Sequence, residues 1–407
     1  MDTINLGIFA PEFFPVWGGT GSYIVELVKN LPANVNIQII TLNRQISDMA
    51  SKELTQNQIS KIIKRPVEIH YVSSSKETFF YNLPFQIACF RKMASLQKQY
   101  HLDILHSQLA HMPDLFIQLL RASKLPTVLT IHSTMQMLRD YAFMAKSLFG
   151  NLEASERNSL LFSPILSVVQ QQYIKNIANF IAVSEMTRKF VIKELKVEPE
   201  KISLIYNGVD TEIFHPPNNE ETARRYSDPT IVYIGRMVAK KGINTLIDAI
   251  PQVLRYFPKA RFLFVGGGNI SAFKAIAAGK GIPESNYAFL GHLGYFERLI
   301  ILREATIFVN PSLFENCSLS ILEAMSSGCS VVASNVGGNP ELISSGVNGL
   351  LTPMLNSGRL AQNILSLLQD DNFNYKIGQE ARRTVERSFS SKKCAMETYE
   401  NYRKVLS

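Results

Sequence analysis

Two cations on one short loop are the first residues whose types could do chemistry. Arg236 and Lys241 lie between Gly235 and Gly242, after an apolar run and before the helical pattern of residues 243–250. A strand-to-helix loop of this kind faces the ligand edge of a parallel sheet, and glycine lets the backbone approach a ligand closely. Two fixed cations there suit a diphosphate leaving group, whose charge grows as its bond breaks. Taken alone, the loop also fits a basic surface loop.

Two glutamates, Glu315 and Glu323, form the second candidate group. If a helix begins between Ser318 and Ser320, Glu315 lies in the loop before it and Glu323 in its first turns. The free N–H groups at that helix start would then point at an anion. A structural alternative stays open, because Ser320-x-x-Glu323 matches a capping box in which the glutamate only reaches back to a backbone N–H.

The first half of the chain carries weaker candidates. Gly18, Gly19 and Thr20 open the helical pattern of residues 23–31, and a glycine loop there can bring N–H groups to a phosphate. His132 ends a predicted strand and should lie at the same edge of its sheet, whereas His106, at the end of the preceding strand, has less weight. A plain turn and satisfied core histidines are the structural alternatives.

Short aliphatic runs alternate with helical patterns, which indicates βαβ units and parallel sheets. The runs form two series separated by a polar linker that begins near Asn207 and continues to Pro229. The fold class predicted is α/β, with two Rossmann-like doubly wound domains facing across a cleft and ligands beyond the carboxyl ends of the strands. The predicted strands are residues 6–10, 37–42, 67–72, 104–106, 127–132, 180–184 and 202–207, then 231–235, 261–266, 287–291, 307–311, 330–334 and 349–352.

Composition limits the classes of function. The chain has 407 residues and a formal net charge of +8 without a dense basic run, so we expect no nucleic-acid partner. The excess suits phosphorylated ligands or peripheral contact with an anionic membrane. No apolar stretch is long enough to span a bilayer and no export signal opens the chain, so we expect a cytoplasmic protein, peripheral at most to the inner face of a membrane. The scattered cysteines predict neither disulfides nor a metal site; they are Cys89, Cys317, Cys329 and Cys394.

Taken together and in this order, these features resemble family 4 of the retaining glycosyltransferases, which have the GT-B fold. The resemblance spans nearly the whole chain and implies an N-terminal acceptor-side domain at 1–208, a donor domain at 209–389, and a terminal helix at 390–407 that packs back on the first domain. The motifs that carry it are Gly18-Gly19-Thr20-Gly21, Val183-Ser184-Glu185, Asn207-Gly208-Val209-Asp210, the Arg236/Lys241 loop, Glu315-x7-Glu323 with its continuation to Gly328, Gly337-Gly338 and Glu341-Leu342-Ile343.

The resemblance also implies a role for each site residue. Arg236 and Lys241 would bind the donor diphosphate beside Gly235, Glu323 would hold the ribose, and Glu315 would sit by the transferred sugar. His132 would contact that sugar near the reacting centre. Further donor contacts are implied for the Gly18, Gly19 and Thr20 turn, for the base-reading residues His292 and Leu293, and for the backbone of Asn316, Cys317, Ser318 and Leu319.

Two positions depart from the family pattern. Cys317-Ser318 stands where many members have Phe-Gly or Phe-Pro, which puts the fit of the donor sugar in question. The run Gly266-Gly267-Gly268 replaces a pattern that often contains an acidic residue.

The function predicted is transfer of a sugar from a nucleotide-diphosphate donor to a hydroxyl acceptor, with retention and without a metal or other cofactor. The sequence does not show whether the donor is of the UDP, GDP or ADP type, and it does not identify the acceptor. The alternatives are a sugar-nucleotide epimerase, a phosphorylase and a catalytically silent protein that binds nucleotide sugars. The weakest alternative is a dehydrogenase, because no G-x-G-x-x-G opens the first helix. Residues 79–99, including Phe85, Phe90, Arg91 and Lys92, form either a lipid-contacting or a buried helix.

Overall fold

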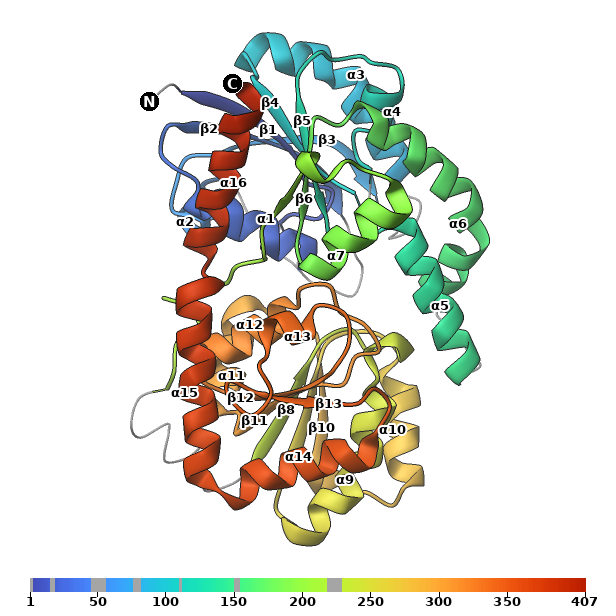
Figure 1. Ribbon diagram of the computed structural model, residues 1–407, viewed down its shortest axis with the longest axis vertical. Coiled ribbons are helices and arrows are strands. Elements are labelled where there is room, and N and C mark those ends of the chain that lie inside the picture. The colour runs from blue at the N-terminus through green and yellow to red at the C-terminus, as the bar shows by residue number, and fades with distance from the viewer. Residues whose placement is uncertain are drawn as a thin grey trace. The chain divides into compact units, whose positions relative to one another are not determined.

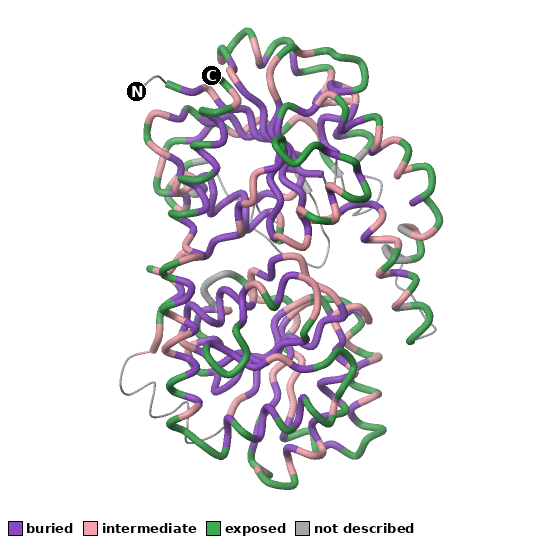
Figure 2. The backbone as a smooth tube through the Cα atoms, viewed as in Figure 1, coloured by how far each residue is buried: buried purple, intermediate pink, exposed green. Residues whose placement is uncertain are grey.

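The computed structural model describes residues 3–14, 19–44, 56–75, 82–109, 112–149, 154–217 and 229–407. They form two compact units, each built around its own parallel sheet (Figure 1). In both units the strands at the centre of the sheet are deeply buried (Figure 2). Unit 1 comprises Met1–Asp140, Ala154–Gly208 and Ser391–Ser407, and unit 2 comprises Tyr141–Glu153 and Val209–Ser390.

The described strands of unit 1 form a seven-stranded sheet in the order β3-β2-β1-β4-β5-β6-β7. Every pairing in it is parallel, and helices on both faces bury β4, β5 and β6 along their whole length. The strand order reverses between β1 and β4, where doubly wound sheets bind ligands. The elements up to β7 are β1 (Ile4–Phe9), α1 (Gly19–Asn30), β2 (Val35–Arg44), α2 (Gln56–Ile63), β3 (Glu68–Ser75), α3 (Asn82–Tyr100), β4 (Ile104–Gln108), α4 (Leu115–Leu119), β5 (Thr127–Ile131), α5 (Met135–Phe149), α6 (Ala154–Tyr173), β6 (Asn179–Ala182), α7 (Glu185–Phe190) and β7 (Ile202–Leu204). Helix α5 starts in unit 1, and its residues from Tyr141 onward belong to unit 2.

The last helix of the chain, α16 (Ser391–Leu406), packs against α1 in unit 1 (Figure 1). Asn34 Nδ2 donates to Tyr399 Oη over 2.9 Å, and Asn30 Nδ2 donates to Ser391 Oγ over 3.1 Å. Deeper in the core, Tyr402 Oη and His106 Nδ1 are hydrogen-bonded at 2.5 Å. The expectation that the terminal helix packs back on the first half of the chain is therefore confirmed.

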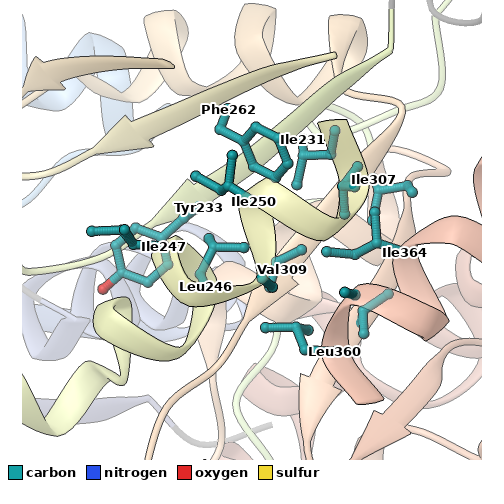
Figure 3. Packing of buried hydrophobic residues seen from close by; sticks show 14 of the residues in the cluster. Ile231, Tyr233, Leu246, Ile247, Ile250, Phe262, Ile307, Val309, Leu360 and Ile364 are labelled. Carbon is teal, nitrogen blue, oxygen red and sulfur yellow. The ribbon is translucent and has the colours of Figure 1, made fainter. Parts of the chain in front are cut away.

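Unit 2 has a six-stranded parallel sheet in the order β10-β9-β8-β11-β12-β13, and its order reverses between β8 and β11. The side chains of Ile231, Phe262, Ile307 and Leu246 pack between the sheet and its helices (Figure 3). The elements are β8 (Thr230–Ile234), α9 (Ile243–Tyr256), β9 (Arg261–Val265), α10 (Ile270–Gly279), β10 (Tyr287–Gly291), α11 (Tyr295–Glu304), β11 (Ile307–Asn310), α12 (Leu319–Ser326), β12 (Ser330–Ser334), α13 (Asn339–Leu342), β13 (Leu350–Thr352), α14 (Ser357–Gln369) and α15 (Asp371–Ser388).

Three expectations from the sequence change in detail. Strand β7 ends at Leu204 rather than residue 207. The predicted linker is anchored at its start, because Val209 N donates to Phe389 O over 3.0 Å, while residues 218–228 lie outside the described part. Helix α3 buries Phe85 and Cys89 on one side, so lipid contact by Phe85 is wrong. Arg91 and Lys92 are exposed on the same helix, and Phe79 lies outside the described residues.

Candidate active site

The strand-order reversal in unit 2 brings together the loops that follow β8 and β11. Lys241 comes from the first loop and Glu315 from the second, 74 positions apart, and Lys241 Nζ lies 2.5 Å from Glu315 Oε1. Their side chains are 24% and 12% exposed, so the ion pair is largely shielded from water. The sequence-based assignment of these two residues to one edge of a sheet matches this contact.

Two neighbours complete the environment of the Glu315 carboxylate. Ser312 Oγ donates to its Oε1 over 2.8 Å, and Asn310 Nδ2 donates over 3.3 Å. Burial on its own would raise the pKa of Glu315, but the Lys241 ammonium and the hydrogen bonds from Ser312 and Asn310 outweigh it and leave that pKa lowered. Glu315 is thus held as an anion in a fixed orientation. The sequence analysis did not identify Asn310 and Ser312 as site residues. Their position was a usable signal, because Asn310 is the last residue of the buried strand β11 and Ser312 lies two residues after it.

Glycines allow the loops of this site to touch. Gly242 has φ +65°, and a Cβ added there would lie 1.9 Å from the carbonyl oxygen of Pro311. Gly337 has φ +56°, and its Cβ would lie 1.9 Å from the carbonyl oxygen of Glu315, to which Gly338 N donates over 2.9 Å. Only glycine fits either position, because the backbone is left-handed and a neighbouring carbonyl fills the space. The loop is therefore fixed at Pro311 by Gly242 and at the Glu315 carbonyl by Gly337 and Gly338.

The start of the cationic loop is fixed in the same way. Tyr233 Oη donates to Arg236 O over 2.9 Å and occupies the space that a Cβ on Gly235 would need. From the next strand, Gly266 approaches so closely that its Cβ would lie 1.9 Å from Gly235 O. The first glycine of the unusual Gly266-Gly267-Gly268 run thus has a packing reason. The Arg236 side chain itself is exposed, on the same loop as Lys241.

Helix α12 starts directly after this group. Ser318 is its N-cap, and its hydroxyl accepts from Ile321 N. The capping-box alternative for Ser320 and Glu323 is therefore wrong, because Ser320 already lies within the helix. The Ser318 hydroxyl also accepts from Asn310 Nδ2 over 3.4 Å, so the departure from the family pattern at this position supplies a cap. The N–H groups of the first turn, near Leu319, have no acceptor within the helix and present partial positive charge.

Glu323, inside α12, has a partner that sequence reasoning missed. Arg298 Nη1 lies 3.2 Å from both carboxylate oxygens, and the two side chains are 16% and 4% exposed. Burial raises the pKa of Glu323, and Arg298 only partly offsets it. Desolvation lowers the pKa of His292, and Arg298 adds to that shift while Glu297 opposes it. Arg298 thus acts electrostatically on both Glu323 and His292. Leu293 follows His292 in the loop after β10.

The candidates of the first half lie in unit 1. His132 follows β5, is hydrogen-bonded to Gln108 Oε1 at 2.9 Å, and contacts the Tyr23 ring edge-on at 4.7 Å. His106 is a buried core residue hydrogen-bonded to Thr130 and Tyr402, which agrees with its ranking below His132 as a site candidate. Gly19 and Thr20 begin α1, whereas Gly18 lies outside the described residues.

Two doubly wound parallel-sheet units, each with a strand-order reversal, have the architecture of the GT-B fold. Residues 17–213 match the family model described as Glycosyltransferase Family 4, and residues 228–370 match the one described as Glycosyl transferases group 1. The chain belongs to glycosyltransferase family 4.

Curated relatives agree with this assignment, and solved structures agree with the fold. The chain is 26% identical to a component of human phosphatidylinositol N-acetylglucosaminyltransferase, over 87% of this chain and 67% of that protein. It is 25% identical to phosphatidyl-myo-inositol mannosyltransferase of Mycobacterium leprae, over 90% of this chain and 88% of that protein. By fold, it is similar to sucrose-phosphate synthase from Thermosynechococcus elongatus, with TM-score 0.79, 19% identity and 99% of each chain covered. It is also similar to Anabaena HepE in complex with UDP-glucose, with TM-score 0.74, 18% identity, and 98% and 100% covered.

Two negative findings concern only the described ranges. Within them, no three His, Cys, Asp or Glu side chains are grouped as a metal site would require. Among the same residues, none of the helices combines the length and hydropathy needed to cross a bilayer.

Proposed function

We propose that this glycosyltransferase moves a sugar from a nucleotide-diphosphate donor to a hydroxyl acceptor with retention of the anomeric configuration. The observation that carries the proposal is the Lys241–Glu315 pair at the switch point, with Arg236 on the same loop. A shielded ammonium there meets the diphosphate where negative charge develops as the glycosidic bond breaks. A HepE structure contains UDP-glucose, which supports a nucleotide sugar as the donor class.

The residues divide the work by position. Lys241 and Arg236 stabilise the departing diphosphate, helped by the N–H groups at the start of α12. Glu315 holds the ammonium and faces the transferred sugar, and Glu323 accepts hydrogen bonds from the ribose. The remaining assignments are His132 to the sugar, the turn at Gly18, Gly19 and Thr20 to the diphosphate, His292 and Leu293 to the base, and the loop residues Asn316, Cys317, Ser318 and Leu319, with Gly235, to sugar and phosphate.

The chemistry proposed is substitution assisted by the leaving group. The bond between the anomeric carbon and the diphosphate oxygen breaks through an oxocarbenium-like state, and the acceptor oxygen attacks from the same face. The acceptor's proton passes to the departing phosphate oxygen, so the products are a glycoside and a nucleoside diphosphate. Protein cations neutralise the diphosphate in this mechanism, so transfer should persist after treatment with EDTA.

Two measurements test this function. Thermal stabilisation by UDP, GDP and ADP identifies the nucleotide, because a ligand at 100 times its dissociation constant adds about 2.7 kcal/mol to the free energy of unfolding. NMR of the first-formed product with the matching sugar nucleotide then gives its anomeric configuration. An inverted product would refute retention. Epimerised donor without a new glycoside would refute transfer.

We further propose an acceptor carried on a membrane surface, with helix α6 as the contact. Leu161, Ile165 and Val168 lie on one side of α6 and are 69%, 67% and 63% exposed, and exposed positions recur along this helix in Figure 2. Residues 158–173 contain no charged side chain, whereas Arg157 precedes and Lys175 follows this stretch. An interfacial helix binds a membrane through such an apolar stripe together with basic residues at its edges. The printed names of the human and Mycobacterium leprae relatives contain phosphatidylinositol or phosphatidyl-myo-inositol, which supports a lipid.

Flotation with vesicles tests the membrane contact. The wild-type protein should float with vesicles containing anionic phosphatidylinositol and less with neutral phosphatidylcholine vesicles. The variant Ile165→Ser should lose most of this binding, whereas Tyr256→Ser, at an exposed aromatic position of unit 2, should keep it. Equal flotation of all three proteins would remove α6 from the proposal.

A further inference from the structure

Arg298 occupies a position fixed by the first turn of α11. Glu297, the preceding residue, accepts from Gly294 N through its Oε2 over 2.6 Å, which closes the start of the helix. The backbone N–H of Arg298 donates to Gly294 O over 3.1 Å. A side chain on this turn therefore starts from a rigid backbone rather than from a loop.

From there, Arg298 reaches a carboxylate on a different helix. Its Nη1 is equidistant, at 3.2 Å, from the two oxygens of Glu323 on α12. The Glu323 side chain is only 4% exposed, so few water molecules can replace this contact. A carboxylate buried without a cation would tend to take up a proton, because the charged form loses its hydration.

We propose that Arg298 is a positioning residue for the donor nucleotide: it holds the Glu323 carboxylate ionised and oriented so that both oxygens accept ribose hydroxyls. This inference rests on the proposed function, in which Glu323 binds the ribose. Hydrogen bonds to an ionised acceptor are shorter and stronger than those to a neutral one. Arg298 thereby sets how tightly the nucleotide binds, without contacting the reacting bond.

The charged and titratable groups around this contact give it a pH signature. On the α11 side they are His292, Glu297 and Arg298; toward α15, Arg382 donates to Ser326 O at the end of α12 over 2.8 Å. The pKa of Glu323 is already raised by burial, so nucleotide binding strengthens as pH rises through it. Without Arg298 that pKa rises further, and the gain in affinity moves to higher pH.

The experiment measures dissociation constants of UDP, GDP and ADP by calorimetry from about pH 4 to about pH 9, a series that starts below the ordinary pKa of a glutamate and ends above that of a histidine. The nucleotide that the wild type binds most tightly is used for the variants. Arg298→Leu should weaken binding about 10-fold near neutral pH, the loss of about one charge-assisted hydrogen bond, and less at the alkaline end. Arg298→Lys should recover most of the loss. Arg303→Leu, on the same helix but paired with His215, serves as the control and should bind as the wild type does.

Two further variants separate this inference from its premises. In Glu323→Gln, adding Arg298→Leu should cause no additional shift of the pH profile, because the titrating group is gone. His292→Gln, at a residue assigned to the base, should weaken binding by the same factor at every pH and leave the midpoint of the profile where it is, which excludes the histidine as its source. If Arg298→Leu weakens binding equally at every pH, or not at all, while Glu323→Gln weakens it, the positioning role is refuted and the ribose role stands. If Glu323→Gln binds like the wild type, both fall, while the role of Lys241 in the proposed function is untouched.

Discussion

Replacing Lys241 by methionine removes the ammonium but keeps a side chain of similar length. Glu315 then keeps Ser312 and Asn310 as donors but loses its cation, while only 12% of its side chain is exposed. Breaking a buried ion pair by removing one partner costs about 3–5 kcal/mol. Because Lys241 is 24% exposed, a lower cost of about 2–3 kcal/mol is expected here. For a unit of this size, that lowers the melting temperature by roughly 4–12 °C.

Turnover by the folded Lys241→Met protein should also fall, by more than the loss of stability can explain. Removing one preorganised charge contact to the developing anion lowers turnover by about 10² to 10³. The double variant Lys241→Met/Glu315→Gln should regain much of the stability, because no buried charge is left unpaired, yet it should stay inactive. Recovery of stability without activity separates the ion pair's structural effect from its chemical one.

The assay follows release of nucleoside diphosphate by the folded fraction at a temperature below every variant's transition. Lys280→Met is the matched control: Lys280 lies 2.6 Å from Asp248, but both side chains are 40% exposed. An exposed pair contributes at most about 1 kcal/mol, so this control should remain active and nearly as stable as the wild type. Undiminished turnover in Lys241→Met would refute the proposed role of the ammonium.

Three further predictions follow from local geometry. Gly266→Ala should destabilise unit 2 strongly, because its Cβ would meet Gly235 O at 1.9 Å, whereas Gly267→Ala, with nothing within 4 Å, should be tolerated in the same thermal melt. Ser318→Ala removes the α12 cap and should cost about 1 kcal/mol in chemical denaturation; an unchanged midpoint would contradict the cap. Burial, with His132 adding to it, lowers the pKa of His106 to about 3 in the folded protein, whereas the unfolded chain has a histidine pKa near 6.5. Below about pH 6.5 the unfolded state therefore takes up a proton that the folded state does not, and the free energy of unfolding falls. At about pH 5 the wild type should have lost about 2 kcal/mol relative to His106→Gln, and parallel curves of stability against pH for the two proteins would contradict this.

The contact between Lys241 and Glu315 could be predicted because two rules combine. Each residue follows a recognisable buried run, and the carboxyl ends of parallel strands meet at one edge of a sheet. Neither rule depends on side-chain detail, so a distance of 74 positions along the chain was no obstacle. Periodicity likewise placed the terminal helix, and the family resemblance predicted that it packs on the first domain; that the partner there is α1 comes from the structure.

Arg298 and the cap at Ser318 could not be predicted in the same way. Arg298 is one of two basic residues on α11, the other being Arg303, and only the packing of α11 against α12 shows that Arg298 reaches Glu323. At the helix start, serines at 318 and 320 are two positions apart and either fits a cap by composition. The choice depends on backbone dihedral angles, and Ser318 has the extended φ and ψ of −74° and 113° that a cap requires.

The glycines explain why so polar a site can be rigid. A buried ion pair stabilises a fold only when its geometry is good and its remaining hydrogen bonds are satisfied. Here the geometry depends on two glycines whose backbones pack directly against a carbonyl oxygen. Gly242 packs against that of Pro311, and Gly337 against that of Glu315. Any side chain at either glycine would push the loops apart and lengthen the contact between Lys241 and Glu315. The charge arrangement that the chemistry needs is therefore encoded as much by residues without side chains as by the charged residues themselves.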